Sequence, residues 1–304
     1  MNKSIIVFLA FVALLFLGAS CDKTDNSGEK TGPFFGGTKG ITTTFVSGNP
    51  PSKFNDDQNV PVKILLKNEG EYDLKSGDAK VKLIGLNPST FDFQGNFLSN
   101  SGNLRGKSEL LLEGGEQEVN FGDLKYLRTV TNSQTFKLRA KTCYPYQTEA
   151  RVPVCIKSTQ LEETGDEIEC EVSGEKVTSN SVSSAPVQVT SLEEELLGSD
   201  RIKFTVMINN AGIGDVHNSN LKCDDIEKEP SAGKNEVNLE ILDTSVKCFF
   251  RDGTESNRGI VEINGQPLTC SKEVKESFED VLTIKLDYKY IDRTEFKDIE
   301  IVES

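Results

Sequence analysis

The sequence contains no tryptophan, one histidine and two methionines, and these absences limit what the protein can do. A structural or catalytic zinc site draws on several cysteine and histidine ligands. The chain has no close Cys-x-x-Cys pair and only His217 to supply an imidazole. The absence of tryptophan also weighs against a site in which sugars stack on aromatic rings. We therefore expect no metal site and no cofactor.

Basic residues are also scarce relative to acidic ones. The chain has 34 lysines and arginines against 48 aspartates and glutamates, for a formal net charge of −14. Phosphate recognition needs clustered basic side chains, so we expect no nucleic-acid partner. We interpret the acidity as an aid to solubility at an exposed surface. Weak binding of divalent cations and adaptation to a salty medium remain open.

Sequence signatures of enzymes are absent as well. The chain has no Gly-x-Ser-x-Gly elbow, no phosphate-binding glycine loop and no His-Glu-x-x-His motif. His217 stands in a polar stretch after an apolar segment, which favours an exposed turn residue over a general base. The acidic groups Glu193 to Glu195 and Asp224 to Asp225 lack the alternating spacing of a calcium loop, so we expect solvated loops there. These observations favour a protein that is not an enzyme.

The N-terminus carries an export signal. Lys3 precedes an unbroken apolar run from Ile5 to Leu17, and Gly18-Ala19-Ser20 forms a small-residue cleavage site before Cys21. The apolar run is shorter than the roughly 20 residues that span a membrane, so we prefer a cleaved signal over a transmembrane helix. The segment resembles a lipoprotein signal peptide with its leucine displaced by one position to Leu17. This resemblance implies that residues 1–20 are removed and that Cys21 carries lipid, with an uncleaved signal anchor as the alternative.

The remaining chain predicts a flexible tether followed by an all-β body. Residues 21–40 are rich in glycine and polar residues, except for Phe34-Phe35, which we expect to dock on the body. Alternation of apolar and polar residues then predicts half-buried strands, separated by turn signals such as Asn49-Pro50-Pro51. The clearest strands cover residues 42–46, 60–66, 80–84, 135–140 and 151–156. Residues 192–197 are the one helix candidate.

The body contains an internal duplication. Residues 62–74 align with residues 204–216 at a single offset, which matches Asn68 with Asn210 and Gly70 with Gly212. The apolar positions 62, 64 and 66 fall on 204, 206 and 208, so Ile64 and Val206 are expected in equivalent cores. A Tyr-x-Tyr pair followed by Thr-Glu closes each half, at Tyr144 to Glu149 and at Tyr288 to Glu295. We interpret these segments as equivalent hairpins whose turns differ in length.

About seven short strands in just over 100 residues predict an immunoglobulin-like β-sandwich for each copy. The strand followed by Asn-x-Gly resembles the cell-adhesion-related domain of bacteria and archaea known as CARDB, in which Asn and Gly shape the turn after an inner strand. A physical reason exists for this arrangement, since both residue types tolerate positive φ. The whole chain also resembles exported two-domain proteins of small-genome archaea, through residues 36–40, 68–73 and 185–187.

These patterns predict two sandwich domains, at residues 41–160 and 185–304. The segment 161–184 is rich in serine, glutamate and threonine without an apolar period, which indicates a linker between jointed domains. A core substitution in one domain is then expected to leave the unfolding transition of the other unchanged.

Six cysteines besides Cys21 fit an oxidising compartment. They are Cys143, Cys155, Cys170, Cys223, Cys248 and Cys270. Cys155 with Cys170 and Cys248 with Cys270 are the pairs that we consider first. Cys143 and Cys223 would then pair only across the domain interface. A rival bridge joins Cys143 to Cys155, and the sequence does not choose between them.

Together these features predict an exported protein on the outer face of the cytoplasmic membrane. We expect a non-enzymatic structural, adhesive or protein-interaction module, whose partners are the membrane and other proteins of the cell envelope. The alternative is a lipoprotein that binds a solute or glycan for a transporter, which needs a concave site rimmed with aromatics. A secreted hydrolase is the weakest interpretation. A deep cleft between the halves would favour the binding lipoprotein, and its absence would favour the structural or adhesive module.

Overall fold

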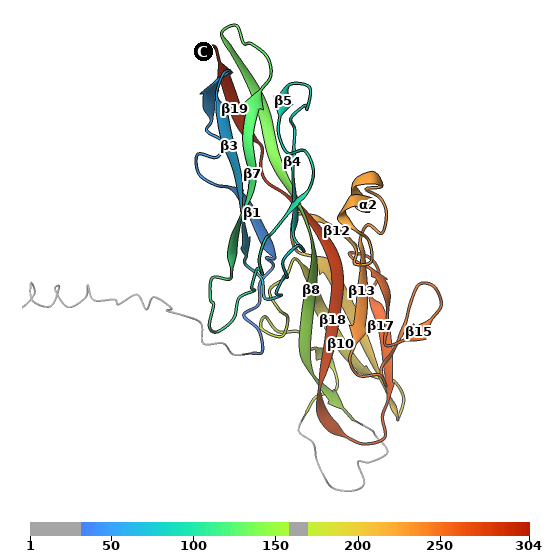
Figure 1. The fold of residues 1–304 in the computed structure, drawn as a ribbon. Helices are drawn as coiled ribbons and strands as arrows, with labels where there is room; N and C mark the ends of the chain where they lie inside the picture. The colour runs from blue at the N-terminus through green and yellow to red at the C-terminus, as the bar shows by residue number, and fades with distance from the viewer. Residues whose placement is uncertain (1–31, 158–169) are drawn as a thin grey trace, which may run out of the picture. The chain divides into compact units, whose positions relative to one another are not determined.

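The structure is a computed structural model that describes residues 32–157 and 170–304. Within these ranges β-strands dominate, and the strand pairs are antiparallel except for β2 (Lys53–Asn55) with β19 (Lys297–Val302) (Figure 1). The all-β class predicted from the alternating pattern is confirmed. The immunoglobulin-like type stays a prediction.

One sheet belongs to the first half of the chain. Its order is β1 (Ile41–Phe45), β3 (Asn59–Asn68), β7 (Glu116–Tyr126) and β5 (Phe91–Asp92). Alternate residues of β3 are buried, because successive side chains of a strand point to opposite faces. The strand predicted at residues 60–66 is therefore confirmed, with Ile64 in the core.

A second sheet repeats this arrangement in the second half. Its order is β9 (Gly174–Glu175), β10 (Val187–Leu196), β11 (Arg201–Asn210), β17 (Leu268–Glu273), β14 (Lys247–Phe249) and β15 (Glu255–Ser256). The order β10-β11-β17-β14 matches β1-β3-β7-β5, and Val206 in β11 is buried like Ile64 in β3. The predicted duplication is confirmed in strand order and in these two core positions.

The third sheet contains strands from both halves. Its order is β16 (Arg258–Glu262), β13 (Glu236–Ile241), β18 (Phe278–Arg293), β8 (Ser133–Ile156), β19 and β2. Three further strands pair with it: β12 (Asp215–Asn218) with β18, β4 (Lys80–Ile84) with β8, and β6 (Leu98–Ser99) with β4.

β8 and β18 join the halves by exchanging their ends. All 16 residues of β18 pair with residues 141–156 of β8, so the end of β8 lies beside strands of the second half. After β18 the chain continues as β19, which pairs with residues 133–138 of β8 in the first half (Figure 1). One large cluster contains most of the buried apolar residues of both halves, and Gly32–Ser304 is one compact unit. The prediction of two jointed sandwiches is therefore not confirmed.

The interpretation of the Tyr-x-Tyr pairs as hairpins was wrong. The strands predicted at residues 135–140 and 151–156 are parts of the single strand β8, and no turn separates them. Tyr144 and Tyr146 lie in the middle of β8 and face Tyr290 and Tyr288 of β18. The period of two continues through both tyrosine pairs, so the sequence between the two predicted strands is itself strand.

The helix predicted at residues 192–197 was also wrong. This segment is the end of β10, where Leu192 and Glu194 are buried and the neighbours alternate with them. A short helix lies instead at α2 (Cys223–Lys228). Six residues are too few to show a helical period in the sequence.

The parts of the predicted linker and tether that the structure describes pack on the body. Residues 161–169 of the linker and residues 21–31 of the tether lie outside the described residues. In the remaining linker, Ser181 to Ser184 are buried, and backbone bonds join Ser183 N to Glu149 O at 2.8 Å and Arg151 N to Ser181 O at 2.7 Å. In the tether, Phe35 N and Gly36 N donate to the Glu71 carboxylate at 3.0 and 3.2 Å, so the expected docking of this segment is confirmed.

Candidate functional site

The centre of the molecule is a closed group of four tyrosines at the pairing of β8 with β18. Neighbouring ring centroids lie 5.6 to 6.4 Å apart, and each ring is at most 3% exposed. The ring order is Tyr144, Tyr146, Tyr288 and Tyr290. A sugar cannot stack on rings that are buried on all sides. The four tyrosines are therefore core residues.

Each hydroxyl of this tyrosine cluster is bonded inside the protein. Tyr144 accepts a hydrogen bond from Ile41 N at 3.2 Å, and Tyr288 accepts one from Val187 N at 3.3 Å, the first residues of β1 and β10. Burial raises the pKa of Tyr290 to about 12 and raises the pKa of the other three above their usual value. The hydroxyls therefore stay protonated at neutral pH, and those of Tyr144 and Tyr288 hold the starts of β1 and β10.

The other two hydroxyls bind the repeated Asn-x-Gly turns. Asn68 Oδ1 accepts from Gly70 N at 3.2 Å and from the Tyr146 hydroxyl at 2.9 Å. Asn210 Oδ1 likewise accepts from Gly212 N at 3.2 Å and from the Tyr290 hydroxyl at 3.4 Å. In each turn the asparagine Nδ2 donates to the backbone oxygen four residues later. The two copies of the motif thus have the same bonds, including the same tyrosine partner.

The turn glycines are needed for space and not for backbone freedom. Neither Gly70 nor Gly212 has a positive φ, and neither asparagine does, so these turns do not use the tolerance of positive φ that both residue types have. A methyl group on either glycine would instead overlap the tyrosine hydroxyl oxygen that bonds the neighbouring asparagine. This contact between glycine and tyrosine cannot be read from the local sequence, because the tyrosines come about 80 residues after their turns.

We expect Gly212→Ala to destabilise the protein by about 1 to 3 kcal/mol, the usual cost of forcing extra atoms into a packed site. Adding Tyr290→Phe should recover part of this loss because it removes the overlapping oxygen. The matched control is Gly70→Ala with Tyr146→Phe. Recovery should be smaller there, since the backbone oxygens of Lys39 and Ser184 also lie 2.6 Å from the added methyl. Urea unfolding of both double-mutant cycles measures the coupling, and equal recovery would contradict this account.

Helix α2 fastens the second half to the first. Cys223 forms a disulfide with Cys143 of β8, and the Glu227 carboxylate pairs with Lys82 at 3.2 Å and with Lys141. Asp224 adds a pair with Lys80 at 3.4 Å. Cys143, Cys223 and Ile226 are buried in an apolar cluster of their own. The helix therefore acts as a covalent and ionic clamp between the halves.

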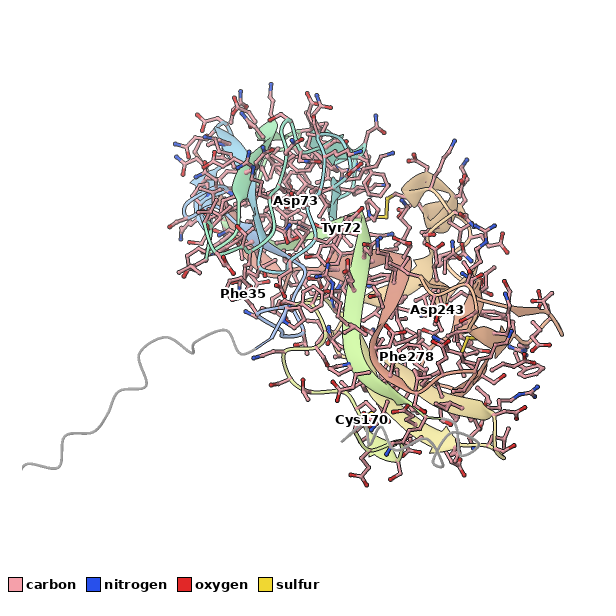
Figure 2. The ribbon with its side chains drawn as sticks, turned by 90° about the horizontal axis from the view of Figure 1, so that it is seen from below. Phe35, Tyr72, Asp73, Cys170, Asp243 and Phe278 are labelled. Atoms are coloured by element: carbon pink, nitrogen blue, oxygen red, sulfur yellow. A yellow bond between two sulfur atoms is a disulfide. The ribbon has the colours of Figure 1, made fainter. Side chains whose placement is uncertain are left out.

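The structure settles the disulfide pairing that the sequence left open. The bridges are Cys143–Cys223, Cys155–Cys170 and Cys248–Cys270, so the rival Cys143–Cys155 bridge is wrong (Figure 2). The rival fails because both cysteines lie on the same extended strand, 12 positions apart, and cannot meet. The three bridges indicate an oxidising, extracellular compartment.

The buried carboxylate of Glu194 binds the C-terminal end of β8, which lies beside strands of the second half. Glu194 of β10 is 2% exposed, and both its oxygens accept the Cys155 N–H at 3.1 Å. Lys176 Nζ lies 3.3 Å from Glu194 Oε2. Burial raises the Glu194 pKa, and the Cys155 N–H and Lys176 only partly offset it. The expectation of a solvated acidic loop was therefore wrong for Glu194, which faces inward on a strand between exposed Glu193 and Glu195.

Glu194→Gln should change how stability depends on pH. Glu194 binds its proton more tightly in the folded protein, since its folded pKa lies above the ordinary value of 4.5. Its contribution to stability is full below that value and is lost as pH rises through the folded pKa. The wild type should thus lose stability relative to Glu194→Gln as pH rises above 4.5, with a constant difference beyond the folded pKa. Urea unfolding of both proteins across this range measures the difference, and a wild type that gains stability relative to the variant would contradict the assignment.

The other residues considered for chemistry do not assemble into a site. His217 was expected in an exposed turn, but it is 2% exposed in β12, and its Nδ1 lies 2.9 Å from Ala232 O. In the backbone His217 pairs with Lys289 of β18 on one side and forms an isolated bridge with Lys234. Asp224 and Asp225 are exposed on α2, as expected of a solvated acidic group. Among the described residues, no group of three His, Cys, Asp or Glu side chains is placed to hold a metal ion.

A surface groove of about 650 Å³ lies at one end of the second half. Its lining includes three basic residues (Arg201, Lys247 and Lys275), three acidic residues (Glu255, Glu273 and Glu276) and one aromatic residue, Phe278. The opposite charges lie close together, with Arg201 and Glu273 3.6 Å apart. Such a lining favours neither an anionic nor a cationic ligand, and Phe278 is the one aromatic ring among the described lining residues on which a sugar could stack.

Comparisons with protein-family models and with curated proteins found no match. Cys21 and the signal at residues 1–20 lie outside the described residues. Within the part of the chain that the structure describes, no helix has the length and apolar character to cross a membrane.

Proposed function

We propose that the protein is an exported, lipid-anchored component of the cell surface that acts as a non-enzymatic structural, adhesive or protein-interaction module. The observation that carries this proposal is the closure of the tyrosine cluster. Tyr144, Tyr146, Tyr288 and Tyr290 were the best candidates for a ligand platform, and their rings and hydroxyls are used inside the protein. The junction between the halves is thus filled by packed core residues, whereas a binding protein would need a cleft there.

The way the halves are joined also supports a structural role. The exchanged ends of β8 and β18, the Cys143–Cys223 bridge and the Glu227 ion pairs all resist separation of the halves. A transporter-linked binding protein depends on hinge motion around its ligand. The resemblance of the Asn-x-Gly turns to CARDB domains supports the adhesive function further.

The anchor is tested by Cys21→Ser in the native host, with Ser20→Ala as the matched control. Cys21→Ser should remove the lipid acceptor, so the protein should be released from the membrane fraction or remain unprocessed, while Ser20→Ala keeps a small residue before the cut and should behave as wild type. Fractionation, mass spectrometry of the N-terminus and protease treatment of intact cells give the readouts. A cleaved Cys21→Ser protein that stays on the membrane would contradict lipid anchoring.

The solute-binding alternative is tested at the groove that contains Phe278. Isothermal titration of the protein with neutral oligosaccharides should give no saturable heat if the protein is a structural module. Saturable binding that is lost in Phe278→Ala, and kept when the exposed Phe249 is replaced by alanine, would favour the alternative.

A further inference from the structure

The loop before β7 displays three consecutive leucines on its surface. Leu110 is 100% exposed and Leu112 is 63% exposed, with Leu111 between them partly exposed. Single exposed apolar residues are common on protein surfaces, but a run of them costs solubility unless it has a function. The loop is a tight turn, in which Ser108 and Leu111 exchange backbone bonds of 3.1 and 3.0 Å.

The base of this leucine loop (residues 108–112) is fixed to the body. Lys107 N donates to Gly70 O at 2.6 Å, and Gly106 N donates to the Asp73 carboxylate at 2.7 Å. On the other side of the loop, Gly115 N donates to Arg105 O at 2.8 Å. The leucines are therefore presented at a defined place beside the Asn68–Gly70 turn.

The same turn receives the first described residues of the chain. The Glu71 carboxylate binds Phe35 N and Gly36 N, while the Glu71 backbone lies against Gly106 at the base of the leucine loop. Figure 1 shows the segment that leads into β7 and the start of the described chain at the same end of β3 and β7, and Figure 2 shows Phe35 on the same side as Tyr72 and Asp73. The leucine loop thus lies where the chain enters the body.

The length of the preceding segment limits how far this end lies from a membrane. Eleven residue steps separate Cys21 from Gly32, and a fully extended chain of that length spans at most about 40 Å. A lipid on Cys21 therefore keeps the entry point, and the leucine loop beside it, close to the bilayer. Leu127, which is 49% exposed, lies farther from this entry point because it follows the other end of the 11-residue strand β7.

We propose that the leucine loop inserts Leu110, Leu111 and Leu112 into the boundary between headgroups and acyl chains of a membrane with zwitterionic lipids. Apolar side chains gain free energy there, whereas the net charge of −14 is repelled by an anionic surface. This inference rests on the proposed lipid anchor. It adds a second contact that sets the orientation of the body on the membrane.

The absence of tryptophan from the chain allows a direct test. Leu110→Trp places a single fluorophore in the loop, and Leu127→Trp is the matched control at the opposite end of the same strand. The processed protein, purified from the native host with its lipid, is reconstituted into phosphatidylcholine vesicles, with and without bromine on the acyl chains. We expect the emission of the Leu110→Trp protein to shift to shorter wavelength and to lose intensity with brominated lipid. The Leu127→Trp protein should show neither change.

Flotation of the same vesicles separates the two proposals. Floating protein whose indole is quenched in Leu110→Trp and unquenched in Leu127→Trp supports the loop insertion. Floating protein that stays unquenched in Leu110→Trp, or that is quenched equally in both variants, overturns the insertion and leaves the anchor intact. Full-length protein that does not float overturns the anchor and, with it, the insertion.

Discussion

Replacing Cys143 and Cys223 together with alanine is expected to lower the free energy of unfolding by about 4.5 kcal/mol. The bridge closes a loop with a sequence separation of 80, and in the chain-entropy model such a loop restricts the unfolded chain by about that amount. The pairs of Lys80 and Lys82 with α2 add little, because their partners are partly exposed. Urea unfolding with linear extrapolation measures the change.

The Cys155 and Cys170 pair provides the matched control for this expectation. Its separation is only 15 residues, so replacing both cysteines with alanine should cost less, about 3 kcal/mol in the same model. A larger loss from the shorter loop, or no loss from Cys143 and Cys223, would show that the clamp at α2 does not stabilise the protein in the way described.

Ile64→Ala should destabilise both halves at once. Truncating a fully buried isoleucine costs about 2 to 5 kcal/mol, and Ile64 is 0% exposed. Because residues 141–156 of β8 pair with β18 and β19 returns to the first half, the third sheet is shared, and neither half keeps it intact when the other unfolds. We therefore expect one calorimetric transition that moves to lower temperature as a whole, in place of the separate transitions that a tandem of jointed domains would show.

Val206→Ala tests the same point from the other half. Val206 is 1% exposed in β11, and its truncation should lower the same single transition. Equality of the calorimetric and van't Hoff enthalpies in both variants would support one cooperative unit. Two resolved transitions, with only one displaced by each substitution, would instead restore the picture of independent sandwiches.

The strands could be predicted from the sequence because their signal is local. In β3 the apolar residues recur at every second position. Because successive side chains of a strand point to opposite faces, this alternation places them all on the buried face of the sheet. The Asn68 and Asn210 motifs were found for the same reason, since each stays within a few residues of its strand. Glu194 and His217 were misjudged because a polar residue in an alternating stretch can be buried by a distant partner.

The all-β class, the duplication and the set of six cysteines follow from the linear pattern alone. Only the tertiary structure shows that β8 and β18 join the two halves and that Cys143 pairs with Cys223. It also shows that the hydroxyls of Tyr146 and Tyr290 leave no space for a side chain at positions 70 and 212. The difference is one of range. Alternation and turn residues act between neighbours along the chain, whereas the strand exchange, the tyrosine hydroxyl contacts and the Cys143–Cys223 bridge join residues about 80 to 170 positions apart, where nothing in the linear pattern selects one partner over another.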